Sequence, residues 1–262
     1  MGIVNVTPDS FFPGSRTASR VDAVARGVSF FEMGCDVVDV GGESTRPGAD
    51  AVDEAEELSR VVPVVAELAR RGTVSVDTKK ASVARAAVGA GATIINDVSY
   101  TLLDLAGELG VGYVAMHSQG DSTTMQINPT YVDIVEEVGE FLRAAAARAA
   151  ALGVAPLWLD PGIGFGKTRE HNLALLAHCH DFVALAHEFG AEVLIGTSRK
   201  RFLGEMARSG APALAVEERL EASIATEAWA LVAGASIVRV HDVRAAVQLR
   251  DLISRPLEAV AA

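Results

Sequence analysis

Short runs of β-branched and apolar residues recur along the whole chain, and each is followed by a longer stretch of helical character. There are eight such runs: GIVNV (2–6), CDVVDV (35–40), TVSVD (73–77), TIINDV (93–98), VGYVAMH (111–117), LWLD (157–160), EVLIGTS (192–198) and SIVRVH (236–241). Alternation of strand and helix is typical of parallel βαβ units. Eight units in 262 residues predict an α/β protein with one domain, a (β/α)8 TIM barrel over residues 1–262. A doubly wound sheet is the alternative, although it usually has fewer strands and a glycine-rich first turn.

Two of the intervening stretches have clear helical periodicity. Residues 131–152 place apolar side chains on one stripe, and Thr130 and Asp133 are spaced as a capping box. Residues 216–233 show the same periodicity, and Gly234 follows them at a position suited to end a helix. Because half of the residues are hydrophobic and only 5% are aromatic, we expect a core built mainly of Ala, Val, Leu and Ile.

The predicted strands end on polar residues that can form hydrogen bonds. These are Asn5, Asp39, Asp77, Asn96 with Asp97, His117, Asp160, Thr197 with Ser198, and Arg239 with His241. A single ending of this kind is explained by helix capping. A full ring of them is what an active site built from βα loops requires, so we expect an enzyme whose site lies at the C-terminal mouth of the strands.

The overall charge restricts the class of partner. The chain has 23 Lys and Arg against 34 Asp and Glu, a net charge of −11, which does not favour nucleic acid or an anionic membrane. An anionic small molecule remains compatible if a local cluster of basic residues binds it. Only two cysteines occur, Cys35 and Cys179, and no uncharged apolar run reaches about 18 residues. We therefore expect a soluble, cytoplasmic protein.

Two kinds of charged group stand at the predicted mouth. Asp77 and Asp160 end the third and sixth strands and could either cap helices or bind the paired N–H donors of a planar nitrogen heterocycle, which Asn96 could also contact. The cations lie near the second, seventh and eighth strands: Arg46, Arg199, Lys200, Arg201, Arg239 and His241. Basic residues near strands seven and eight favour a phosphate-bearing substrate, although helix-end charge pairing would explain Lys200 or Arg201 alone.

The segment LDPGIGFGKT (159–168) resembles a nucleotide-binding loop without being one. A P-loop requires a first glycine five residues before Gly166, where Pro161 stands. The spacing of Gly162, Gly164 and Gly166 also differs from the dinucleotide fingerprint G-x-G-x-x-G. The function of this loop must therefore come from the remainder of the chain.

Taken together, the motifs resemble the dihydropteroate synthase family. They are IVNVTPDSF (3–11), GGESTRPG (41–48), SVDT (75–78), IINDVS (94–99), MH-x-QG (116–120), LDPGIGFGKT (159–168), SRK-x-F-x-G (198–204) and VRVHDV (238–243). They occur in order over nearly the whole chain and are specific as a set, although other pterin-binding proteins share the barrel and some pterin contacts. LDPGIGFGKT corresponds in this resemblance to the pterin loop of the sixth strand.

The resemblance implies that 7,8-dihydropterin-6-ylmethyl diphosphate condenses with p-aminobenzoate, releasing diphosphate in the presence of Mg²⁺. It assigns Asp77, Asn96, Met116, Asp160, Phe165, Gly196, Lys200 and Arg239 to the pterin. It assigns Asn5, Arg46, Arg239 and His241 to the diphosphate, with Asn5 also at the metal, and Thr45, Pro47 and Arg201 to p-aminobenzoate. Arg46, Lys200, His241 and Asp77 are the expected catalytic residues. A homodimer is implied as well.

The chain departs from the family pattern at a few positions. The first loop has SFFPGS where SFSDGG is common, and Tyr100 stands where glycine is usual. The loops 7–19 and 43–53 are rich in Pro, Gly, Ser and Asp and are candidate lids. The first departure affects the expected loop closure, p-aminobenzoate affinity and sulfonamide response. Two alternatives to the synthase therefore remain: a pterin-binding paralogue without catalysis or with another role, and a methyltetrahydrofolate-dependent methyltransferase.

Overall fold

The computed structural model describes residues 1–7, 20–44, 51–120, 124–206 and 212–254. Eight parallel strands form one sheet in sequence order, and each overlaps one of the eight predicted runs, with β2 extending one residue beyond its run to Gly41. They are β1 (Gly2–Asn5), β2 (Val37–Gly41), β3 (Thr73–Asp77), β4 (Ile94–Asp97), β5 (Gly112–Met116), β6 (Leu157–Asp160), β7 (Glu192–Ile195) and β8 (Ile237–Val238). The α/β class with parallel strands is thus confirmed.

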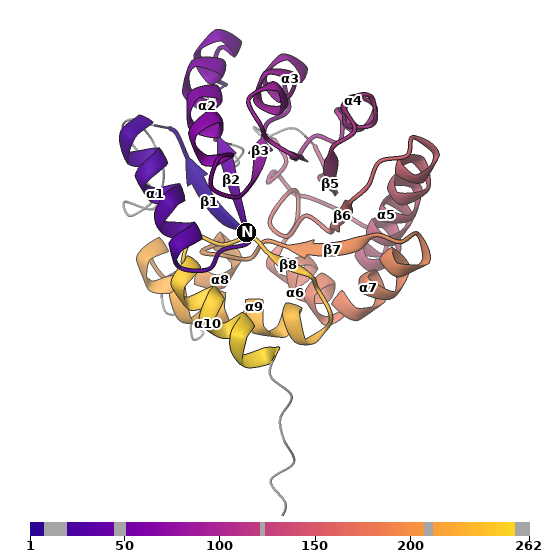
Figure 1. Ribbon diagram of the computed structural model, residues 1–262. Helices are drawn as coiled ribbons and strands as arrows, with labels where there is room; N and C mark the ends of the chain where they lie inside the picture. The colour runs from indigo at the N-terminus through magenta and orange to yellow at the C-terminus, as the bar shows by residue number, and fades with distance from the viewer. Residues whose placement is uncertain (8–19, 45–50, 121–123, 207–211, 255–262) are drawn as a thin grey trace, which may run out of the picture.

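Helices surround the curved sheet, as the view along its axis shows (Figure 1). They are α1 (Arg20–Glu32), α2 (Glu54–Leu68), α3 (Ala81–Gly89), α4 (Leu103–Leu109), α5 (Ile134–Ala151), α6 (Arg169–Ala177), α7 (Cys179–Glu188), α8 (Arg201–Gly204), α9 (Leu220–Val232) and α10 (Val243–Ile253), with a 3-10 turn η2 (Val216–Arg219) before α9. Within the described ranges, none of these helices has the length and apolar character needed to span a membrane.

The two ends of the sheet are joined by backbone hydrogen bonds. Val240, two residues beyond β8, forms a parallel bridge with Gly2. The N–H of Ile3 donates to the carbonyl of Val240 at 3.0 Å, and the N–H of Val240 donates to the carbonyl of Met1 at 2.9 Å. The first and last strands are therefore neighbours.

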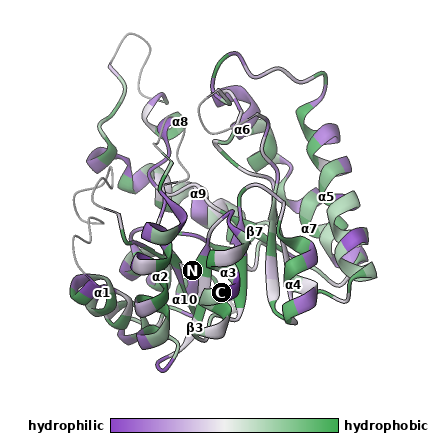
Figure 2. Cartoon of the chain, turned by 90° about the horizontal axis from the view of Figure 1, so that it is seen from above, coloured by the Kyte–Doolittle hydropathy of each residue, from purple (hydrophilic) through white to green (hydrophobic). Residues whose placement is uncertain are grey.

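Alternation along the strands divides the core into two parts. Side chains such as Ile95 and Ala115 pack with the helices in the larger cluster, in which Val, Ala, Leu and Ile predominate as predicted. Their neighbours Ile94 and Val114 point to the opposite face of the sheet, because successive strand residues alternate. The second cluster fills the interior below the site with Met1, Ile94, Val114, Trp158 and Leu194. Figure 2 shows loops and the short helices α6 and α8 projecting beyond one end of this sheet.

Two predicted helix boundaries have different outcomes. Helix α5 begins at Ile134 rather than residue 131, because the Asp133 carboxylate accepts hydrogen bonds from the N–H groups of Val135 and Glu136. The proposed capping box with Thr130 is therefore wrong. At the other helix, Gly234 has φ +101° directly after the final turn of α9, so its predicted role in ending the helix is confirmed.

Tyr100 explains why glycine is usual at its position. Its φ is +55°, in the left-handed region that glycine adopts without steric cost. The ring packs edge-on against Phe141 with 5.0 Å between centroids. This aromatic contact offsets a backbone cost of about 1 kcal/mol for a residue with a Cβ.

We predict an inverted order of stability for substitutions at Tyr100. Both Tyr100→Ala and Tyr100→Gly lose the ring contact, but only alanine retains the strained Cβ, so the alanine variant should be less stable by about 1 kcal/mol. Chemical denaturation of both variants measures this difference. The same pair of substitutions at Thr101, which is exposed and lacks a positive φ, should show the ordinary order with glycine less stable. Equal behaviour at the two positions would contradict the strain.

Candidate active site

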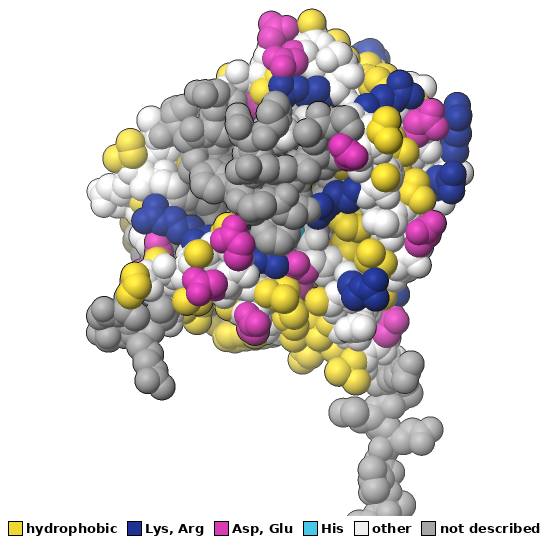
Figure 3. Space-filling view, turned by 90° about the vertical axis from the view of Figure 1, so that its left-hand side faces the viewer, with side chains coloured by type: hydrophobic (Ala, Val, Ile, Leu, Met, Phe, Trp, Pro, Cys, Tyr) yellow, Lys and Arg dark blue, Asp and Glu magenta, His cyan; other side chains and the backbone are white. Residues whose placement is uncertain are grey.

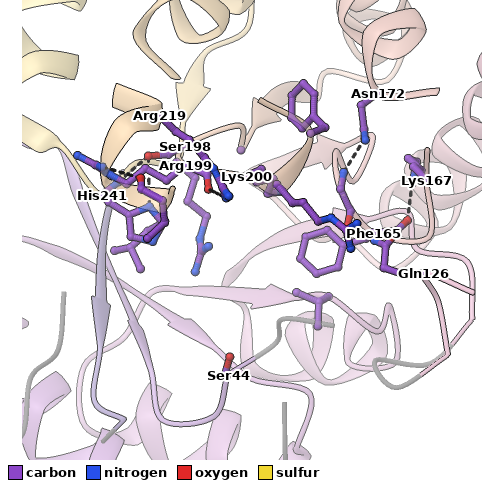
Figure 4. A pocket seen from close by; sticks show the side chains of 18 of the residues that line it. Ser44, Gln126, Phe165, Lys167, Asn172, Ser198, Arg199, Lys200, Arg219 and His241 are labelled. Atoms are coloured by element: carbon purple, nitrogen blue, oxygen red, sulfur yellow. Dashed lines mark hydrogen bonds between the residues drawn. The ribbon is translucent and has the colours of Figure 1, made fainter. Parts of the chain in front are cut away.

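A cleft of about 1320 Å³ opens at the C-terminal ends of the strands. Most of the predicted site residues line it: Asn5, Asp77, Asn96, Met116, Asp160, Phe165, Gly196, Lys200, Arg201, Arg239 and His241. Figure 4 shows Ser198 and His241 on one side of the cleft and Phe165 and Lys167 on the other. The remaining predicted residues, Thr45, Arg46 and Pro47, lie outside the described residues, as does most of the first loop (8–19).

The floor of the cleft is a cluster of buried charges. The Arg239 guanidinium donates from Nε to Asp39 Oδ2 and from Nη2 to Asp77 Oδ2, each at 2.6 Å. Asn96 Nδ2 donates to the same Asp39 oxygen at 2.9 Å. Asp39 is fully buried and Asp77 is 4% exposed. One arginine thus joins the end of the sheet at β8 to β2 and β3.

The Asp77 carboxylate combines burial with an unsatisfied oxygen. Burial raises its pKa to about 7, Arg239 opposes this increase, and Asp39 reinforces it. Its Oδ1 has no hydrogen-bond partner among the described residues. A buried acceptor of this kind is costly unless a ligand satisfies it. Asp77 is therefore suited to receive an N–H donor from a bound molecule.

Asp160 sits at the start of the glycine-rich loop and organises its first turn. Its Oδ1 accepts a hydrogen bond from the N–H of Gly162 at 2.7 Å. Burial raises the pKa of Asp160 above its usual value, while Lys200 and the Gly162 N–H oppose that shift. At Gly162, with φ +70°, an added Cβ would lie 1.8 Å from the His117 carbonyl oxygen. The glycine is required because this loop packs directly on the segment after β5.

The same loop is held in place by three side chains, two from the connection between β5 and α5 and one from α6. Gln126 Nε2 donates to the Gly164 carbonyl at 2.6 Å, and the Tyr131 hydroxyl donates to the Gly166 carbonyl at 2.8 Å. The N–H of Gly164 donates to Asn172 Oδ1 at 2.6 Å. The backbone groups of the loop are thus bonded to protein, which agrees with the absence of a P-loop pattern.

Phe165 and Lys200 are partners across the cleft (Figure 4). The Lys200 ammonium lies 4.6 Å from the centroid of the Phe165 ring and donates to the carbonyl of Ile163. Gly196 lies beside them, since an added Cβ would be 3.8 Å from Lys200 Nζ. The ring, the cation and the glycine together line one part of the cleft.

Lys167 is a buried residue that the sequence interpretation did not single out. Its ammonium is within hydrogen-bond distance of the Phe165 carbonyl at 3.0 Å, His117 Nδ1 at 2.9 Å and the His117 carbonyl at 3.3 Å. Burial lowers its pKa to about 7, Asp160 opposes the shift, and Lys200 contributes to it. The sequence signal that could have identified Lys167 is the set of glycines before it, Gly162, Gly164 and Gly166. Glycines at such spacing indicate that other backbone segments approach this loop closely.

The loops after β7 and β8 are joined by Arg199. Its guanidinium forms a bidentate ion pair with Asp242, with Nε–Oδ2 at 2.7 Å and Nη2–Oδ1 at 2.8 Å. The residue has φ +56° and is 7% exposed. Next to it, Ser198 Oγ accepts from the N–H of His241 at 3.1 Å. Arg199 therefore positions its neighbours, whereas the sequence grouped it with the ligand-binding cations.

Arg201 stands at the outer rim rather than in the buried cluster. Its side chain is 84% exposed, and its Nε is 2.7 Å from Glu205 Oε1. Such an exposed pair contributes at most about 1 kcal/mol and can be exchanged for a ligand carboxylate. Arg201 is thus accessible to an anionic group at the cleft entrance.

The described residues contain no cluster of three or more His, Cys, Asp or Glu side chains arranged to bind a metal ion. Asn5 ends β1 and lines the cleft, and its side chain carries an amide oxygen. Mg²⁺ commonly takes one or two protein oxygens and completes its octahedron with water and substrate phosphates. The donor set therefore suits a magnesium ion carried largely by a phosphorylated substrate.

Comparison with known proteins gives a consistent result. The family described as "Pterin binding enzyme" matches residues 1–241. Dihydropteroate synthase of Escherichia coli K12 is 42% identical over 267 aligned positions, which cover 99% of this chain and 92% of the relative.

Two solved structures are similar over nearly the whole chain. A Yersinia pestis dihydropteroate synthase in a sulfonamide drug complex has a TM-score of 0.87 and 39% identity, covering 96% of this chain and 91% of that one. A Xanthomonas albilineans dihydropteroate synthase with 4-aminobenzoic acid has a TM-score of 0.83 and 43% identity, covering 97% and 93%.

The pKa of Lys167 predicts a pH-dependent contribution to stability. Above pH 7 the folded protein holds this lysine neutral while the unfolded chain keeps its proton until about pH 10.4, so the free energy of unfolding should rise with pH over that window. Relative to Lys167→Met, the wild type should gain about 2 kcal/mol between pH 7 and 9. Urea denaturation at several pH values measures the gain, and Lys79→Met, at a half-exposed position, serves as the control. A constant difference between wild type and Lys167→Met would contradict the shifted pKa.

Proposed function

This chain belongs to the dihydropteroate synthase family of pterin-binding enzymes, and from that premise we propose how its own residues carry out the reaction. The function is the condensation of 7,8-dihydropterin-6-ylmethyl diphosphate with p-aminobenzoate to 7,8-dihydropteroate, with release of diphosphate. The assignments of individual residues, the metal, the complete barrel and the dimer are the parts of the proposal that follow.

The pterin ring binds on the charged floor. The observation that carries this assignment is the set of buried acceptors at one level of the cleft: Asp77, Asn96 and Asp160. A pterin presents an amino group and ring N–H groups along one edge, which match carboxylate and amide oxygens. Phe165 and Met116 supply apolar contact, Gly196 leaves room for the ring, and Lys200 and Arg239 lie beside it.

The diphosphate binds at the cationic side of the cleft, near His241 and Arg239, with Arg46 from the second loop. Negative charge grows on the departing oxygens as the carbon–oxygen bond breaks. Cations that interact more strongly with this charge than with the ground state lower the barrier. Arg46 and Lys200 are therefore the catalytic cations, His241 is the catalytic hydrogen-bonding group beside them, and Asp77 is the catalytic carboxylate that stabilises the cationic methylene carbon with Asp160.

Mg²⁺ fits the proposal as an ion held by Asn5 and by the diphosphate itself. Bound there, it supplies charge stabilisation to the leaving group. Asn5 contributes a neutral oxygen, so most of the ligands come from the substrate and water.

p-Aminobenzoate binds at the outer rim, with its carboxylate near Arg201 and its ring bordered by Thr45 and Pro47. Its amine is nucleophilic without activation, so the reaction requires no side-chain nucleophile. The location of p-aminobenzoate at the rim agrees with the accessibility of the basic Arg201 side chain there. The buried acceptors on the floor are then left for the pterin.

The proposal also includes a closed (β/α)8 barrel in a single domain over residues 1–262, supported by the two hydrogen bonds that Val240 forms with the first strand. A cytoplasmic location agrees with the two cysteines, both free. The partners are the two small substrates, with neither nucleic acid nor membrane involved, in keeping with the net charge of −11.

A homodimer through α9 and α10 completes the proposal. Trp229 and Val232 of α9 are 49% and 73% exposed, and Leu252 of α10 is 67% exposed. The two helices pack against each other, so these side chains belong to neighbouring surfaces. Apolar atoms gather along the lower edge of the face in Figure 3, on the side where α9 and α10 lie in Figure 1. Exposed large apolar groups of this kind favour a protein interface.

Turnover with two variants tests the functional assignment. Purified protein with the pterin diphosphate, p-aminobenzoate and Mg²⁺ should form dihydropteroate and diphosphate in equal amounts. Asp77→Ala should weaken pterin binding by about 100-fold, because a buried charge-assisted contact is lost. Arg46→Ala should mainly lower kcat, by about 100-fold, because its contact strengthens as the diphosphate departs.

The two products and the two variants separate the competing outcomes. Diphosphate without dihydropteroate would indicate that water captures the carbon, as expected from a defective p-aminobenzoate site. Pterin binding without any product would favour the non-catalytic paralogue. Normal pterin binding by Asp77→Ala would refute the assignment of the floor.

For the dimer, we expect Val232→Glu to yield a monomer in sedimentation equilibrium at concentrations where the wild type is dimeric. A buried unpaired charge at an apolar interface is strongly unfavourable. Val132→Glu is the matched control, since Val132 is also fully exposed but precedes α5, far along the chain from α9. A monomeric wild type, or a dimer unaffected by Val232→Glu, would exclude this interface.

A further inference from the structure

We propose that Asp39, which does not line the cleft, is a positioning residue that sets the hydrogen-bonding pattern of the pterin site by fixing the orientation of the Asn96 amide. The inference rests on the proposed pterin-binding function and extends it to substrate discrimination. It comes from the geometry beneath the cleft floor.

Asp39 does not reach the cleft surface, although its side chain contacts two residues that do, Asn96 and Arg239. In the strand register it is opposite Ile3 and Ser75, whereas Asp77 is opposite Gly41 and Asn96. The Asp39 side chain is fully buried and is absent from the cleft surface, while Asn96 and Asp77 form part of that surface. Any effect of Asp39 on a ligand must therefore pass through these neighbours.

A carboxylate determines which end of an amide faces it. A carboxylate oxygen accepts hydrogen bonds, so the Asn96 atom 2.9 Å from Asp39 Oδ2 is the Nδ2 donor. The Asn96 carbonyl oxygen is consequently turned away from Asp39, as an acceptor for the ligand. Arg239 Nε donates to the same Asp39 oxygen at 2.6 Å, so this oxygen accepts from both neighbours.

The result is a site that presents acceptors to the ligand edge. Asn96 offers its carbonyl oxygen, and Asp77 offers Oδ1, which has no partner among the described residues. A heterocycle with N–H donors at this edge satisfies both atoms. An oxo group in place of the exocyclic amine would set two acceptors against each other, which leaves a buried polar group unpaired. Asp39 thus contributes to the preference for a 2-amino heterocycle.

The test compares two ligands that differ at C2 and, in consequence, at N1, which bears a hydrogen in lumazine but not in pterin. Pterin carries an amino group at C2, and lumazine carries an oxo group there. We expect the wild type to bind pterin at least about 100-fold more tightly than lumazine, as measured by titration calorimetry. In Asp39→Asn the residue can accept or donate, so Asn96 is no longer held in one orientation. Pterin should then bind about tenfold more weakly, and the pterin-to-lumazine ratio should fall by at least about tenfold.

A matched carboxylate controls for loss of stability. Asp97 is also fully buried, ends β4 next to Asn96, and accepts hydrogen bonds from Tyr113 and from the backbone at Thr101 and Leu102. Asp97→Asn should lower the melting temperature but leave the pterin-to-lumazine ratio unchanged. Asn96→Ala alone and combined with Asp39→Asn completes a double-mutant cycle, in which the effects on the ratio should be strongly non-additive.

A measurement on the wild type keeps the inference testable if Asp39→Asn fails to fold. In protein labelled with 15N-asparagine, the Asn96 side-chain amide protons, identified by their absence in Asn96→Ala, should exchange slowly both with and without pterin. Fast exchange would overturn the inference, as would an unchanged ratio in folded Asp39→Asn or equal weakening of both ligands. If the wild type bound neither ligand, the pterin-binding function itself would fail, which is a separate outcome.

Discussion

The guanidinium of Arg239 lies buried between the carboxylates of Asp39 and Asp77, and the C-terminal face of the sheet is arranged around it. Removing three charges from water is costly, and replacing such a cluster with apolar residues often stabilises a protein. The cluster is therefore better explained by the site than by folding stability. It links strands at the two ends of the sequence and holds two carboxylates at one end of the cleft with only one cation between them.

The glycine-rich loop after β6 meets two structural requirements. It must approach the end of β5 closely enough that Gly162 has no room for a Cβ, and it must still carry Phe165 at the edge of the cleft. Lys167 fills the space behind the loop and binds the carbonyls of Phe165 and His117. Burial of the Lys167 side chain behind the loop disfavours its charged form and therefore lowers its pKa. The loop is thus a rigid wall held by side chains and not a phosphate cradle.

The strands and most of the cleft were predictable because their signals are local. β-branched runs ending on Asp77, Asn96 and Asp160 place these side chains at one end of a parallel sheet by register alone. The beginning of α5 was misplaced by three residues because an aspartate immediately before the helix can cap it without an earlier partner. Arg201 was predictable as a cation but not as an exposed one, since its exposure depends on where α8 packs.

Long-range pairings could not be read from the sequence. Asp39 appeared to end the second strand, yet β2 continues to Gly41, and the partner of Asp39, Arg239, lies 200 residues away in sequence. Arg199 belongs to a run of three basic residues, and only the fold shows that Asp242 neutralises it. In both cases the residue type indicated charge, but the pairing depended on which segments become neighbours in the folded sheet.

The distribution of charge in the cleft matches the chemistry proposed for it. Carboxylates and amide oxygens lie at the floor, and basic groups lie near the ends of β7 and β8. In the proposed binding mode, a substrate with an N–H-rich ring at one end and a diphosphate at the other places its ring at the acceptors and its diphosphate at the basic groups. The carbon between them then lies where negative groups on one side stabilise its growing positive charge and cations on the other stabilise the departing oxygens. Asp77 and Asn96 are held by hydrogen bonds to Arg239 and Asp39 before the substrate arrives, so the proposed chemistry needs little reorganisation on that side as the bond breaks.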